Sequence, residues 1–114
     1  MMSESKQKIA NTPEPPYYAV IFTSLLFGEV EGYDDMAAEM NELAAQQPGF
    51  LGVETARASS VFGITVSYWK DEASIQAWKN NAEHQWAQEL GKEKWYKSYT
   101  LRIAKVERAY GGNK

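Results

Sequence analysis

Residues 17–27, YYAVIFTSLLF, constrain the fold more than any other segment of this chain. The segment is rich in aromatic and branched residues and lacks proline, which predicts a β-strand. Alternate side chains of a strand point to opposite faces. Here both sets are largely apolar, Tyr17, Ala19, Ile21 and Leu25 on one face and Tyr18, Val20, Phe22 and Leu26 on the other. A strand with two apolar faces is expected to be buried on both sides.

The remaining pattern predicts an α+β fold. Residues 33–46 predict a helix, because Met36, Met40, Leu43 and Ala44 fall on one apolar stripe. Residues 50–57 and 61–69 predict strands, a second helix is expected to begin after an Asp71 N-cap and run to about residue 94, and residues 96–110 predict the last strand. This order is the ferredoxin-like split βαβ arrangement, in which both helices cover one face of a four-stranded antiparallel sheet.

The second face of such a sheet needs a cover. On the third strand Phe62, Ile64, Val66 and Tyr68 share one face, and the strand carries Trp69 on its other face. Exposing that other face would leave an apolar patch larger than the few hundred Å² usual on soluble monomers. We therefore expect a homodimer in which two sheets face one another and form a dimeric α/β barrel.

The termini lie outside the expected domain of residues 17–110. Residues 1–16 predict a disordered or extended arm, or one lying across a partner subunit, and residues 111–114 a flexible tail. The arm has no long apolar run, so we expect neither a secretion signal nor a membrane span. A cytoplasmic location is the default expectation.

Charge and cysteine content argue against several classes of function. The net charge is -3 and no basic stripe is present, which argues against nucleic-acid binding. Zero cysteines exclude disulfides and thiolate metal sites. There is one histidine, His84, and the acidic residues near it lack the spacing of metal ligands, so we expect no metal site.

Residues 68–96 hold all four tryptophans and the single histidine. The motifs YWKDE at 68–72, AWK at 77–79 and EH at 83–84, preceded by PGFLG at 48–52, resemble the antibiotic biosynthesis monooxygenase-like family. GK at 91–92, WY at 95–96 and VERAY at 106–110 are similar to an uncharacterised bacterial branch of it. The resemblance covers about residues 17–110 and implies a dimeric α+β barrel. Some family members oxidise polycyclic phenols with O₂ and neither metal nor flavin, others degrade haem, and many have no known activity.

A cofactor-independent monooxygenase acting on a small aromatic or quinol-type compound is the leading hypothesis. His84 would act as the base, since its ordinary pKa lies near working pH, with Trp78 beside it as a second catalytic residue. Phe22, Tyr18, Met36 and Trp69 would line an apolar pocket whose indole N–H groups serve as donors. Gln88 is a further candidate at this pocket, and Arg102 could hold an anionic substrate between the sheets.

A non-catalytic ligand-binding or purely structural barrel is the alternative. On an unbroken helix Ile75, Trp78, Ala82, Trp86 and Leu90 form one stripe of core type, and His84 lies about 120° from Trp78. Gln88 is then the nearer neighbour, so pairing of His84 with Trp78 requires a bend at Asn80–Asn81. A cavity of about 300 Å³ or more near these residues would favour a ligand site over a filled interior.

Haem degradation is a less favoured alternative. The haem-degrading branch of the family uses an Asn on the first strand, a Trp in the second helical region, which Trp78 matches, and a His one helical turn beyond position 84. Ile21 or Phe22 stands at the place of the Asn and Gln88 at the place of the His.

Overall fold

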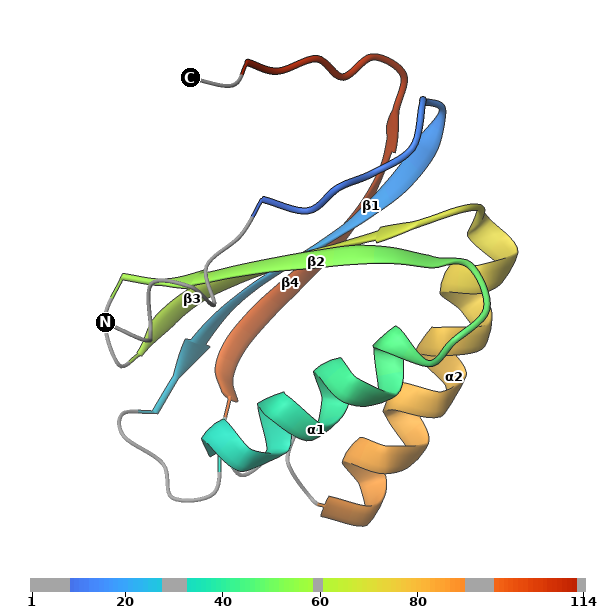
Figure 1. The fold of residues 1–114 in the computed structure, drawn as a ribbon. Coiled ribbons are helices and arrows are strands. Elements are labelled where there is room, and N and C mark those ends of the chain that lie inside the picture. Colours follow the sequence, from blue (N-terminus) through green and yellow to red (C-terminus); the bar gives the residue numbers. More distant parts are fainter. Residues whose placement is uncertain (1–8, 28–32, 59–60, 90–95, 113–114) are drawn as a thin grey trace.

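The computed structural model describes residues 9–27, 33–58, 61–89 and 96–112, with the backbone alone over residues 83–89 (Figure 1). The elements are β1 (Tyr17–Leu26), α1 (Tyr33–Ala45), β2 (Phe50–Arg57), β3 (Phe62–Trp69), α2 (Glu72–Glu89) and β4 (Tyr96–Val106). This order of elements confirms the predicted α+β class.

The sheet has the order β2-β3-β1-β4, and every neighbouring pair is antiparallel. Both helices lie on the same side of it, below the sheet in Figure 1. This is the ferredoxin-like arrangement expected from the sequence. β1 is an inner strand, paired with β4 over Tyr17–Leu26 and with β3 over Tyr18–Leu25.

The core lies between the helices and the sheet. One cluster joins Val20, Ala44, Trp69 and Ile75, and the other joins Leu26, Tyr33, Met36, Met40 and Tyr96. We call the side of the sheet that carries Val20 and Trp69 the helix face, and the opposite side the outer face. The helix face is therefore the one that holds the buried core.

The structure corrects the side on which Trp69 lies. The sequence separated the two faces of β3, but it placed Trp69 on the face without helices. Trp69 instead has no exposed surface and is the cross-strand partner of Tyr18, beneath Ile75 of α2. Phe62 and Ile64 lie on the outer face, 39% and 37% exposed. An apolar outer face is thus present, made by the other set of side chains.

The α2 helix is continuous from Glu72 to Glu89, so the break considered at Asn80–Asn81 is absent. The amide side chains of both residues are hydrogen-bonded within the helix or across to the α1 end. Gln76 Nε2 donates to Asn80 Oδ1 over 3.2 Å, and Asn81 Nδ2 donates to Gln47 Oε1 over 3.1 Å. Because these amides bond to other side chains, they leave the helical backbone hydrogen bonds undisturbed.

Residues 9–16 form no helix or strand and lie on the outer face (Figure 1). The Ala10 amide donates to Glu54 Oε2 on β2, and Thr12 Oγ1 donates to the Tyr17 hydroxyl, both over 2.9 Å. Residues 1–8, the rest of the predicted arm, lie outside the described part of the chain. No described helix combines the length and the apolar character that crossing a bilayer requires.

The N-cap predicted at Asp71 is present, since Asp71 Oδ1 accepts from the Ser74 amide and the Ser74 hydroxyl over 2.9 and 2.7 Å. These hydrogen bonds, the hydroxyl first, lower the pKa of Asp71 below its ordinary 3.8. A carboxyl whose pKa is lowered on folding stabilises the protein above its unfolded pKa and loses that contribution as the pH falls through its folded pKa.

We therefore expect Asp71→Asn to lower the melting temperature at neutral pH, and the deficit to shrink as the pH falls below 3.8. Thermal unfolding of both proteins followed by circular dichroism across this range measures the effect. A deficit that stays constant down to full protonation of Asp71 would contradict the assignment.

Candidate functional site

A cavity of about 470 Å³ lies between α1 and the helix face of the sheet. Phe22, Met36, Ala37 and Met40 supply its apolar wall. The polar part of its lining comes from Tyr33, Asp34, Asn41, Thr55, Arg57, Thr65 and Tyr96. A cavity that combines an apolar wall with convergent polar groups can hold a small molecule in a defined orientation.

Two tyrosines and an arginine form the polar cluster of this cavity. Tyr33 begins α1, Arg57 ends β2 and Tyr96 begins β4. The Tyr33 hydroxyl accepts hydrogen bonds from Arg57 Nη2 over 3.1 Å and from the Tyr96 hydroxyl over 3.2 Å. The guanidinium also lies 5.1 Å from the centroid of the Tyr33 ring, within cation–π range. A permanent cation and two phenols therefore meet at one point of the wall.

Burial, followed by the hydrogen bond to Tyr33, raises the pKa of Tyr96 far above its ordinary 10.0. Tyr96 thus remains a neutral phenol and a hydrogen-bond donor throughout the physiological range. Because its hydroxyl already donates to Tyr33, Tyr96 holds that phenol in place beside Arg57 and does not suit the role of a general base.

Gly63 makes room for the arginine. It is the cross-strand partner of Arg57, and a Cβ at this position would lie 2.7 Å from Arg57 Cζ. Because glycine has no Cβ, the Arg57 guanidinium can lie across β3 toward Tyr33. A glycine in a strand here marks the close approach of a functional side chain.

Aromatic contacts brace the apolar wall. The Phe22 ring packs edge-on against Tyr96 with centroids 5.5 Å apart, and Tyr96 packs edge-on against Tyr33 at 5.7 Å. Across the floor of the cavity the hydroxyls of Thr55 and Thr65 are 2.8 Å apart. The rigid rings and the short hydroxyl contact fix the shape of the cavity before any ligand enters.

The predicted pocket residues divide between the two core clusters. Phe22 and Met36 line the cavity under α1. Trp78 packs against both clusters, and Tyr18 packs with Trp69 in the other cluster. The Trp69 ring stacks on Trp78 with centroids 6.2 Å apart, and its Nε1 donates to Ser67 Oγ over 2.8 Å. Because that N–H is already used, Trp69 is a core residue here rather than a donor to a ligand.

Arg102 lies on the outer face of β4, opposite Ile21, so it is separated from the cavity by the sheet.

His84 and Gln88 belong to the part of α2 whose side chains lie outside the described residues, as does Trp86. The backbone nevertheless bears on the proposed pair. On the continuous helix, positions 78 and 84 are about 120° apart, so the bend that pairing of His84 with Trp78 requires is missing.

Sequence reasoning missed the polar residues of the cavity, above all Tyr33, Arg57 and Tyr96. One signal was available, because Thr55 and Arg57 are two positions apart on β2 and their side chains therefore point to the same face. Tyr33 and Tyr96 gave no such signal, since they are 63 residues apart and meet only in the folded chain. Among the described residues no group of three or more His, Cys, Asp or Glu side chains is arranged to hold a metal ion.

The family model for "Antibiotic biosynthesis monooxygenase" matches residues 16–90, which is well over half of the chain. The chain belongs to the antibiotic biosynthesis monooxygenase family. An uncharacterised protein of this kind in Bacillus subtilis, YqjZ, is 52% identical over 100 residues, covering 88% of each protein. A jasmonate monooxygenase of Pyricularia oryzae is 30% identical over 101 residues, covering 84% of this chain but 46% of that longer protein.

Solved structures support the same fold assignment for this antibiotic biosynthesis monooxygenase domain. NE2512 of Nitrosomonas europaea, a protein of unknown function, superposes with a TM-score of 0.69 at 16% identity, covering 90% of this chain and all of that one. SnoaB, a cofactor-independent oxygenase of Streptomyces nogalater, gives a TM-score of 0.67 at 12% identity, covering 83% and 97%. At such identities the likeness concerns the fold.

The hydroxyl contact in the cavity can be tested directly. Tyr96→Phe removes the donor to Tyr33 and leaves the ring packing intact, so we expect a loss of about 1 kcal/mol in the free energy of unfolding. Urea denaturation measures it, with Tyr110→Phe as the matched control because Tyr110 is 95% exposed. Equal stability of the two variants would mean that the buried contact contributes nothing.

Proposed function

We propose that this protein is a cofactor-independent monooxygenase that oxidises a small aromatic, quinol-type compound in the cavity under α1. The observation that carries the proposal is the meeting of Arg57, Tyr33 and Tyr96 on the wall of a cavity of about 470 Å³ that also has an apolar wall. The apolar wall suits an aromatic ring system, and the cation with its phenols suits a phenolate oxygen.

For this oxidation by O₂, the protein would need mainly to bind the substrate anion and exclude water. An ionised, electron-rich phenol can pass an electron to O₂, after which carbon and oxygen combine. In the overall reaction a ring CH₂ loses two hydrogens and gains one oxygen atom, and the second oxygen atom leaves as water. All electrons come from the substrate and O₂, so no external reductant is consumed. The positive charge of Arg57 would favour the phenolate form in which transfer begins.

Two relatives support the oxygenase proposal by name, namely the jasmonate monooxygenase and the cofactor-independent oxygenase SnoaB. The second candidate function is ligand binding without turnover. It is favoured by the make-up of the cavity wall, because its described residues include no histidine and Tyr96 is held neutral. The base of the oxygenase proposal would then be Asp34, which lines the cavity, or else His84 or the solvent.

An oxygen-electrode assay with anthrone- and quinol-type phenols separates the two. For the oxygenase we expect Arg57→Gln to lower kcat by about 100-fold, the usual effect of removing one oxyanion donor. Arg102→Gln, on the outer face, is the matched control and should keep the wild-type rate. Saturable binding of these phenols without O₂ uptake would establish the binding module instead.

A third variant assigns the base. If His84 removes the phenol proton, the His84→Ala variant should be slower than wild type at pH values below the pKa of the substrate. Its rate should return to the wild-type value at higher pH, where the substrate ionises in solution. Equal rates of wild type and His84→Ala at every pH would remove His84 from the mechanism.

We further propose that two copies associate through the outer faces of their sheets. Phe62 and Ile64 are more than one-third exposed there, and Ile21 and Leu25 of β1 lie beside them. Association with the same face of a second copy would bury these apolar side chains away from water. The cavity under α1 lies on the other face, so association would leave it accessible.

Ile64→Lys should therefore convert a dimer into a monomer in sedimentation velocity at micromolar concentration, because a charge would be buried at the interface. Leu101→Lys is the matched control. Leu101 is 44% exposed on the helix-face side of β4, so the dimer should persist in that variant. A wild-type chain that sediments as a single subunit would overturn the assembly.

A further inference from the structure

A second cavity, of about 440 Å³, lies on the outer face at one end of the sheet. It is open to solvent and lined by the arm of residues 9–15, by the strand residues Tyr17, Glu54 and Tyr68, and by residues 109–111. The arm and the segment that follows β4 both lie on the side of the sheet opposite the helices (Figure 1). The cavity shares no lining residue with the cavity under α1. It is therefore a separate site built largely from the two ends of the chain.

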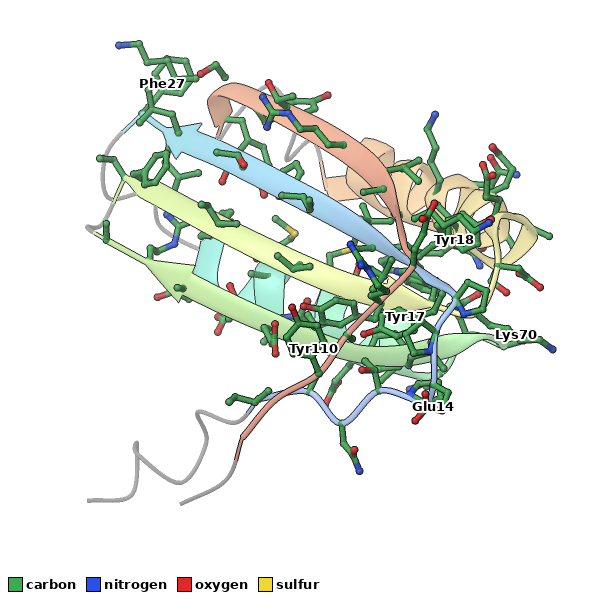
Figure 2. All side chains as sticks on the ribbon, turned by 90° about the horizontal axis from the view of Figure 1, so that it is seen from above. Glu14, Tyr17, Tyr18, Phe27, Lys70 and Tyr110 are labelled. Carbon is green, nitrogen blue, oxygen red and sulfur yellow. The ribbon has the colours of Figure 1, made fainter. Side chains whose placement is uncertain are left out.

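Aromatic rings and carboxylates dominate the chemistry of this cavity. Tyr17, Tyr68 and Tyr110 all contribute to its wall, as do Glu14 and Glu54. Figure 2 shows Glu14, Tyr17 and Tyr110 at the same end of the sheet, away from Phe27 at the other end. Within the described part of the chain, its lining includes neither lysine nor arginine. Ring faces and carboxylates both attract positive charge, so the site disfavours anions and suits cations.

The carboxylate of Glu54 is held in a fixed position. Its Oε1 accepts from the Tyr68 hydroxyl over 2.7 Å, and its Oε2 accepts from the Ala10 amide over 2.9 Å. A carboxylate offers about four acceptor positions, so these two donors leave capacity for a ligand. The Tyr68 ring is itself fixed by edge-on packing against Tyr17, with centroids 5.9 Å apart.

Burial of the Tyr68 hydroxyl and its hydrogen bond to Glu54 raise the pKa of Tyr68 to about 12. The phenol therefore remains the donor and Glu54 the acceptor at physiological pH.

We propose that this second cavity binds a small organic ammonium cation between the tyrosine rings and the Glu54 carboxylate. A metal ion fits less well, because the described residues contain no cluster of three or more metal-ligating side chains. Alkylammonium groups, by contrast, are recognised by aromatic faces with a nearby carboxylate. The proposal is independent of the monooxygenase proposal, since Glu54 points to the outer face and its neighbour Thr55 to the cavity under α1.

Isothermal titration of the full chain, in whatever assembly it adopts, tests the site. The probes are tetramethylammonium and choline, and 3,3-dimethylbutan-1-ol serves as the uncharged isostere of choline. Sodium chloride at matched ionic strength gives the baseline. We expect saturable binding of both cations and at least about tenfold weaker binding of the alcohol, because only the charge differs.

Glu54→Gln keeps the size of the side chain and an oxygen that accepts from Tyr68, but it removes the charge. We expect it to weaken cation binding by about tenfold, and Glu42→Gln, a matched change on the exposed side of α1, to leave binding unchanged. Tyr110→Ala removes one ring from the wall at a 95% exposed position, where the fold does not depend on it, and should weaken binding several-fold.

The result that would overturn the proposal is equally specific. No saturable binding by the wild-type chain, equal affinity for the alcohol, or unchanged affinity in Glu54→Gln would each reject a cation site. If Glu54→Gln fails to fold by circular dichroism, Tyr110→Ala decides, and wild-type affinity in that variant rejects the site.

Discussion

The pairing of β1 with both β3 and β4 is the constraint on which the rest of the structure depends. A strand that is apolar on both faces is stable only when both are covered. Its inner position in the sheet places Val20 and Phe22 under the helices and Ile21 and Leu25 on the outer face. The helix face then acquires the core and a cavity. The outer face retains exposed apolar side chains, Phe62 and Ile64 among them.

Alternate side chains of β2 line two different cavities. Thr55 and Arg57 reach the cavity under α1, whereas Glu54 reaches the outer-face cavity and holds the arm through Ala10. Because successive side chains point to opposite faces, one short strand supplies a cation to one cavity and a carboxylate to the other. The two cavities therefore differ in the charge of the ligand that each would accept.

Sequence patterning anticipated most of the fold and part of the cavity. The apolar stripe of α1 and the N-cap at Asp71 are as predicted, because both are local and depend only on spacing along one helix. Of the residues proposed for a pocket, Phe22 and Met36 line the cavity under α1, and their role in binding a ligand stays a prediction. Trp69 was assigned to the wrong face, since alternation separates two sets of side chains without saying which set meets the helices. The suggested bend at Asn80–Asn81 failed because the side chains of both residues found other partners.

The sequence by itself determined the order of elements, the two apolar faces of β1 and membership of the antibiotic biosynthesis monooxygenase family, because these depend on local periodicity and short motifs. Only the tertiary structure decided that Tyr33, Arg57 and Tyr96 meet, and that Gly63 leaves the space in which they do. Contacts between residues distant in the chain depend on strand register and helix placement. No local pattern encodes them.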